Sequence, residues 1–151
     1  MSDDYIHIIP AIPGFVPDQA RRDDAVSHFR SIAPKATEVS SKISDHLEFV
    51  HCGGNFEEIR CPSCKAVIEL DLWQGWMDDD CSEKGFTLTL RAMRCCGAQH
   101  TLHDLAYVWP QGFARCDVCA MNPNIGKLSD DQRSRFEEIL GCPVRVIYEH
   151  F

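Results

Sequence analysis

The chain has 151 residues, 44% hydrophobic and 25% charged, which is the composition of one globular domain and excludes a disordered chain. Fifteen Lys and Arg residues against 23 Asp and Glu residues give a formal charge of −8, which is unfavourable for gripping a phosphate backbone. Because no apolar run reaches the ~20 residues of a membrane span and no secretory signal follows the acidic N-terminus, we expect a cytoplasmic protein without membrane contact.

The first 50 residues predict a strand, a helix and a second strand. Residues 5–9 form a short β-prone run that Pro10 closes, and residues 17–33 carry apolar side chains at helical spacing up to Pro34. Residues 37–50 are β-prone again, so we expect a second strand there. Its expected buried side chains are Val39, Ile43, Leu47 and Phe49.

The chain changes character between residues 56 and 110, where regular periodicity is short and all three tryptophans lie. We expect a strand at 65–70, a helix from Asp71 to about Glu83, and a strand at 86–90, where polar and apolar residues alternate. The tryptophans are Trp73, Trp76 and Trp109.

The C-terminal part resumes the earlier pattern. Residues 113–121 alternate as a strand, and Ser129 with Gln132 forms a capping box that predicts a helix ending at Gly141. Residues 144–148 predict the last strand. The expected inward face of the strand at 113–121 carries Ala114, Cys116, Val118 and Ala120.

Two cysteine pairs about thirty residues apart predict a metal site. Cys61-Pro62-Ser63-Cys64 is a turn that brings two thiolates together, and Cys95-Cys96 supplies two more, which completes a closed tetrahedral set for structural Zn²⁺. A regular second turn would have cysteines at 93 and 96, but position 93 is Met93, so His100 remains an alternative to Cys95 or Cys96. The predicted ligands are Cys61, Cys64, Cys95 and Cys96.

The other cysteines predict no second site. Nine cysteines without an export signal favour metal binding over a disulfide framework. Cys116 and Cys119 repeat the spacing of the first pair, but in a strand they point to opposite faces. Cys52, Cys81 and Cys142 are interpreted as packing residues.

Leaving out the middle of the chain, the element order is β-α-β followed by β-α-β. We therefore predict an α+β fold, a ferredoxin-like split βαβ scaffold, as a single domain over 1–151. A zinc-ribbon-like insertion over residues 55–110 would lie between its second and third strands.

Three polar groups are weaker candidates. His100, His103 and Asp104 could serve acid–base chemistry but are more typical of hydrogen-bonded structure. The run 78–80 of three aspartates is expected to be a solvated surface that could steer a basic partner. We expect Trp73 and Trp76 to pack on the metal site and Trp109 to join the insertion to the scaffold, with exposed interface anchors as the alternative.

Seven short motifs spread over the chain carry a resemblance to known proteins: Cys52-Gly53-Gly54-Asn55-Phe56, Cys61-Pro62-Ser63-Cys64, Cys95-Cys96-Gly97-Ala98, Trp109-Pro110, Gly112-Phe113-Ala114-Arg115, Asn122-Pro123-Asn124 and Leu140-Gly141-Cys142. In these motifs, much of the chain resembles a family of small, uncharacterised bacterial cytoplasmic proteins. The resemblance supports the four-cysteine ligand set and implies no activity.

The expected function is that of a non-enzymatic zinc-binding protein that binds a protein partner with a basic surface; an immunity or antitoxin-type protein is one concrete form. The alternative is a thiol–disulfide oxidoreductase using Cys61 and Cys64, because Cys-Pro-Ser-Cys-Lys also resembles a glutaredoxin active site. That chemistry needs the first cysteine at a helix N-terminus, whereas a strand is expected after Cys64. A nucleic-acid-binding zinc ribbon ranks third because of the negative charge.

Overall fold

The computed structural model describes residues 2–151 and shows a mixed α+β protein, as predicted. Its main sheet contains β1 (Asp4–Pro10), β2 (Glu38–Val50), β9 (Gly112–Met121) and β10 (Val144–His150). The strand order is β10-β1-β9-β2, and every neighbouring pair is antiparallel. The four main strands expected from the sequence are thus confirmed.

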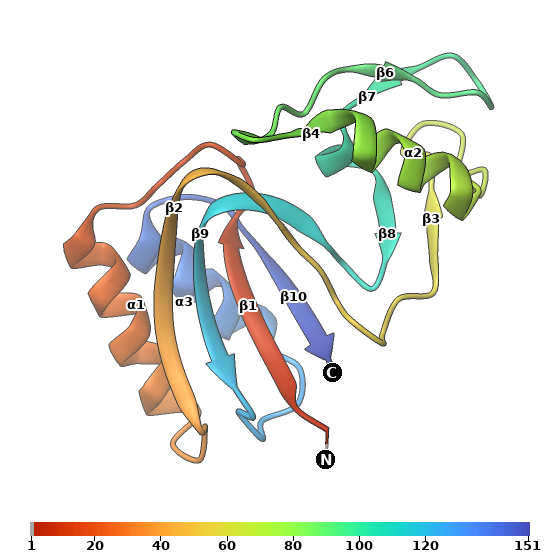
Figure 1. The fold of residues 1–151 in the computed structure, drawn as a ribbon. Coiled ribbons are helices and arrows are strands. Elements are labelled where there is room, and N and C mark those ends of the chain that lie inside the picture. Colours follow the sequence, from red (N-terminus) through yellow and green to blue (C-terminus); the bar gives the residue numbers. More distant parts are fainter. Residues whose placement is uncertain (1) are drawn as a thin grey trace.

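Two helices, α1 (Gln19–Ile32) and α3 (Asp130–Leu140), cover one face of this sheet (Figure 1). The carboxylate of Asp18 accepts a hydrogen bond from the Arg21 N–H and caps α1. The capping box predicted before α3 is present, and the helix ends at Gly141, whose φ of 74° is left-handed. Local signals therefore place both helices.

The main core lies between these helices and the sheet. Phe29 of α1 and Phe136 of α3 are fully buried and meet edge to face with ring centroids 5.1 Å apart. From the sheet, Ile8 and Val118 reach the same core, and both are fully buried. Replacing a buried phenylalanine by alanine typically lowers the free energy of unfolding by about 3–5 kcal/mol. This layer is therefore a stable support for the open face of the sheet.

The chain between β2 and β9 folds into small elements beyond one end of the main sheet (Figure 1). We call residues 51–111 the β2–β9 connection. Its short strands pair as β3 with β8, β4 with β5 and β6 with β7. The elements are β3 (Glu58–Arg60), α2 (Leu70–Asp80), β4 (Cys81–Ser82), β5 (Gly85–Phe86), β6 (Arg91–Ala92), β7 (Gln99–His100), the 3₁₀ helix η1 (Leu102–Asp104) and β8 (Ala106–Val108).

An aromatic cluster attaches this connection to the sheet. Trp73 of α2 is only 9% exposed, its ring centroid lies 5.9 Å from that of Phe49 on β2, and its indole N–H donates to the Tyr107 hydroxyl. At the other end, Trp109 meets Tyr148 of β10 edge to face. Trp109 therefore joins the connection to the scaffold as expected, whereas Trp73 packs against the sheet as well as in the apolar cluster that contains Cys61 and Trp76.

The predictions of two strands inside the connection, at residues 65–70 and 86–90, are wrong. Residues 65–70 form no strand, because Lys65 adopts a left-handed φ of 67° and only Val67 makes a β-bridge, to Arg60. Of residues 86–90, only Phe86 lies in a strand. The backbone N–H groups of the next three residues donate to one side chain, the carboxylate of Asp80, instead of to a strand.

Asp80 also contradicts the expected solvated acidic run. It is 3% exposed, and its carboxylate accepts from the backbone N–H groups of Thr87, Leu88 and Thr89 and lies 3.6 Å from Arg91. Asp80 therefore stabilises the connection and is not part of a solvated surface that could steer a partner.

Three smaller expectations are corrected as well. Helix α2 begins after Glu69 rather than at a capping Asp71, and it ends at Asp80 because Cys81 pairs with Phe86 in a short ribbon. Cys81 is consequently exposed rather than packed. Ile43 is 57% exposed because the register between β2 and β9 shifts directly after it.

Candidate metal centre and polar cavity

The structure brings the four predicted ligands together. The sulfur atoms of Cys61, Cys64, Cys95 and Cys96 all lie within 4.8 Å of one another. The Sγ–Sγ distance is 3.7 Å for Cys61 and Cys96 and 3.2 Å for Cys64 and Cys95. A tetrahedral zinc–thiolate site with bonds of about 2.3 Å separates its sulfurs by about 3.8 Å, so the cluster has the size of a metal site.

Two turns with the same backbone pattern present these sulfurs. In the first turn, Lys65 N–H donates to the Cys61 carbonyl and Cys61 N–H donates to the Ala66 carbonyl. In the second turn, residues 97, 93 and 98 make the same two hydrogen bonds, from Gly97 to Met93 and from Met93 to Ala98. Lys65 and Gly97 also share a left-handed φ, 67° and 75°.

Superimposing the two patterns explains the irregular second cysteine pair. Met93 occupies the position of Cys61, and Cys96 that of Cys64. Met93 is 3% exposed and packs into the same apolar cluster as Cys61. Position 93 therefore carries no thiol in the second turn. Cys95, which corresponds to Ser63 of the first turn, supplies the second sulfur instead.

The alternative ligand His100 lies nearby but is engaged elsewhere. Its Nε2 atom is 2.8 Å from the Ser63 hydroxyl oxygen, and it does not belong to the four-residue ligand group. The geometry thus favours the four cysteines over the set in which His100 replaces one of them.

The electrostatics of the cluster favour a bound cation. Hydrogen bonds from the backbone of Cys64 and Ser63 lower the pKa of Cys61 to about 6, so this sulfur is a thiolate at neutral pH. The neighbouring Cys64 side chain raises the pKa of Cys95 to about 12. Four thiols held this close oppose one another's ionisation, and a metal ion relieves that opposition. Four soft sulfur donors in this arrangement suit Zn²⁺ or iron.

The cysteines outside the cluster, apart from exposed Cys81, lie as the sequence predicted. Cys116 is 1% exposed and shares the alternating buried positions of β9 with Val118 and Ala120 of the main core, whereas Cys119 is half-buried and lines a surface with His7. Cys52 and Cys142 are buried packing residues. The two cysteines of the 116–119 pair therefore do not share an ion.

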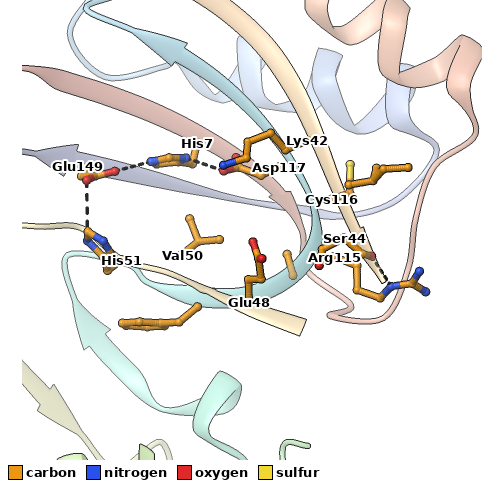
Figure 2. Close-up of a pocket in the computed structure, with 13 residues that line it drawn as sticks. His7, Lys42, Ser44, Glu48, Val50, His51, Arg115, Cys116, Asp117 and Glu149 are labelled. Carbon is orange, nitrogen blue, oxygen red and sulfur yellow. Dashed lines mark hydrogen bonds and ion pairs between the residues drawn. The ribbon is translucent and has the colours of Figure 1, made fainter. Parts of the chain in front are cut away.

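A polar cavity that the sequence did not predict lies on the open side of the main sheet (Figure 2). It measures about 290 Å³. His7 of β1 lines this cavity; its Nδ1 lies 2.8 Å from Asp117 and its Nε2 lies 2.7 Å from Glu149. Burial opposes a charge on this imidazole, but the hydrogen bonds to Asp117 and to Cys119 outweigh it and raise the pKa of His7 to about 11.

The shape of this cavity comes from an irregularity in β2. The register passes from Ile43 opposite Cys116 to Glu48 opposite Ala114, so β2 carries three extra residues there. Arg115 holds the displaced segment by donating its Nε–H to the Ser44 carbonyl. Lys42 and Glu48, both on β2, line the cavity together with His7 (Figure 2).

Both nitrogens of the His7 ring are bound by carboxylates, so the imidazole has no free base for acid–base catalysis. The array instead ties β1, β9 and β10 together across the sheet. The sequence did not predict this array, because the two carboxylates lie 110 and 142 residues from His7 along the chain.

This array predicts a pH-dependent stability. His7→Gln should lower the free energy of unfolding at pH 7 by about 3 kcal/mol, because two largely buried carboxylates lose their cation. Since the folded pKa of His7 is raised above its unfolded value, its contribution is complete below about pH 6.5 and disappears as the pH approaches 11. Urea unfolding of wild type and His7→Gln at pH 6.5, 9 and 11 measures the difference in unfolding free energy between them.

The matched control is His150→Gln, because His150 is half-exposed and pairs with the exposed Asp4. It should change the unfolding free energy by less than about 1 kcal/mol. A difference between wild type and His7→Gln that stays constant from pH 6.5 to 11 would contradict the assigned charge.

The other sequence candidates are structural. His103 is 3% exposed, its Nε2–H donates to the Ala11 carbonyl and its Nδ1 accepts from Phe113 N–H. Burial and the nearby Arg145 lower the pKa of His103 to about 4, so it is neutral. Asp104 accepts from the Thr101 hydroxyl. His103 thus fixes the start of β9, and Asp104 stabilises the turn that carries it.

Comparison with protein-family models, curated proteins and solved structures finds no match for this chain. Within residues 2–151, no helix has the length and apolar character needed to cross a bilayer. The chemistry of the site is therefore the basis for assigning a function.

Proposed function

We propose that this chain is a non-enzymatic zinc-binding protein whose metal builds a surface for a protein partner. The convergence of four sulfurs from two matching turns is the observation that carries the proposal. Zn²⁺ with four thiolate ligands has no open coordination position, so it would shape the β2–β9 connection rather than activate a substrate.

The fold is proposed to be a ferredoxin-like split βαβ scaffold with a zinc-ribbon-like insertion at residues 55–110. Support comes from the strand order β10-β1-β9-β2. The first β-α-β unit contributes β1 and β2, the second contributes β9 and β10, and the strands of the two units alternate across the sheet. The paired short strands around the two cysteine turns support the ribbon.

An apolar groove beside the cysteine cluster is the proposed partner surface. It measures about 240 Å³, and exposed Val67 lies on it together with the half-buried Trp76. Exposed apolar side chains around a tryptophan are typical of protein interfaces. The groove is lined by Val67, Ile68, Glu69, Leu72, Trp76, Met93, Arg94 and Cys95.

Charge near the groove favours a basic partner. Glu69 and Arg94 both line the groove, helix α2 beside it carries Asp71 and Asp78, and the whole chain has a formal charge of −8. A zinc ion with four thiolates adds a further net charge of about −2 beside them. An immunity or antitoxin-type protein that neutralises a basic toxin is one form of this function.

The oxidoreductase alternative has weaker support. The pKa of Cys61 is lowered, but its side chain is fully buried and the turn that carries it precedes no helix until Leu70. Attack on a substrate disulfide needs an accessible thiolate at a helix N-terminus. Nucleic-acid binding is disfavoured by the charge.

A comparison of two surface variants tests the partner surface. Val67 and Ile43 are 55% and 57% exposed, but only Val67 lies on the groove. We expect Val67→Glu to reduce recovery of a specific partner from the native host at least about tenfold, because a carboxylate would be buried against apolar atoms of the interface. Quantitative mass spectrometry of proteins retained by the zinc-loaded chain measures it.

Ile43→Glu is the control and should retain that partner. If every protein recovered with the wild type is recovered equally with Val67→Glu, the groove is not the partner surface.

A further inference from the structure

The four cysteines differ in their access to solvent. Cys61 is fully buried, whereas Cys64, Cys95 and Cys96 are exposed. Zinc-bound thiolates remain nucleophilic, so a small oxidant could reach three of the four ligands without unfolding the chain.

The geometry also selects which exposed sulfurs would join. Cys64 Sγ and Cys95 Sγ lie 3.2 Å apart and come from different turns. A disulfide between the adjacent Cys95 and Cys96 would need a strained ring, and a bond to Cys61 would need access to a buried sulfur.

One of these two sulfurs belongs to both the metal cluster and the groove. Cys95 is a candidate ligand and also lines the apolar groove beside Trp76 and Met93. Moving its sulfur out of a metal site would therefore change the groove itself.

We propose that hydroperoxides switch this surface by oxidising Cys64 and Cys95 to a disulfide, with release of the zinc ion; this rests on the proposed zinc site. One thiolate attacks the O–O bond of hydrogen peroxide, which gives a sulfenic acid and, after protonation, one water. The second thiolate displaces the sulfenic oxygen as another water and forms the S–S bond. The two sulfurs together lose two electrons, and the peroxide gains them.

The metal leaves because it loses two of its four ligands, and Cys61 and Cys96 remain reduced. The new disulfide still links the two turns, so the connection is rearranged rather than unfolded. A thiol reductant and Zn²⁺ restore the starting state.

Peptide mapping of the zinc-loaded full chain tests the switch. Trypsin cleavage leaves Cys61 and Cys64 in the peptide 61–65 and Cys95 and Cys96 in the peptide 95–115. After one equivalent of hydrogen peroxide, we expect these two peptides to be linked through Cys64 and Cys95, with one zinc released per chain. Hydrogen exchange at residues 66–77, which border the groove, should rise and return on reduction.

Cys64→His is the matched variant, because a three-cysteine, one-histidine set still binds zinc but lacks the reacting pair. It should release zinc at least about tenfold more slowly under the same peroxide. Exposed Cys81, away from the cluster, is the internal reference and should form no disulfide with it.

The outcomes separate this inference from the zinc site. Protein that contains no metal before oxidation would contradict the proposed function. Zinc-loaded wild-type protein that keeps its metal under peroxide, or that links any other cysteine pair first, would overturn the switch alone.

Discussion

Replacing Cys61 by serine should abolish metal binding and remove most of the thermal stability of the β2–β9 connection. Structural Zn²⁺ contributes on the order of 10 kcal/mol, comparable with the whole stability of a small domain. Cys61 is fully buried beside Met93 and Trp73, so serine would also place a hydroxyl group in an apolar cluster. Elemental analysis of protein purified without chelator, together with thermal unfolding, measures both effects.

Cys116→Ser is the matched control because Cys116 is 1% exposed but lies in β9, away from the cluster. It should lose about 1–3 kcal/mol from the buried hydroxyl and keep one metal per chain. Stoichiometric metal in Cys61→Ser, or none in the wild type, would contradict the ligand assignment.

Replacing Cys95 by serine should also remove the metal, and a second substitution, Met93→Cys, should restore it. The backbone of residues 93–98 repeats that of residues 61–66, so a cysteine at position 93 would stand where Cys61 stands in the first turn. The double variant then carries the regular spacing, with cysteines at positions 93 and 96. Zinc stoichiometry and melting temperature of the single and double variants give the result.

Met93→Cys alone is the control and should bind one metal, since the four original thiols all remain available. His100→Ala should also keep the metal because His100 contacts Ser63 instead. A double variant that stays folded but metal-free would show that position 93 does not face the cluster. Loss of metal in His100→Ala would restore that residue as a ligand.

The main core and the cysteine cluster lie in different parts of the molecule. The helix-covered face of the sheet supplies the main core, and the aromatic cluster around Trp73 seats the connection on Phe49 and Phe113. The cysteine cluster then needs to organise only the outer turns, where regular structure is shortest. If the proposed zinc ion is bound there, the groove beside the cluster is the part of the surface that we expect to change on metal release.

Local sequence signals were sufficient for the scaffold. The capping box at Ser129, the left-handed Gly141 and the alternation along β9 each act over a few residues, and the structure contains all three. The first cysteine turn is equally local. The order of these elements and the residue types of the ligands could therefore be predicted from the sequence alone.

Only the tertiary structure decided the features that depend on distant partners. Residues 87–89 have strand propensity, but the buried carboxylate of Asp80 takes their backbone N–H groups. Likewise, the cavity at His7 exists because three strands bring together carboxylates 110 and 142 residues away and β2 bulges beside them. Sequence periodicity shows which face of a helix or strand is apolar. Which groups a carboxylate binds depends on the tertiary packing that brings distant residues together.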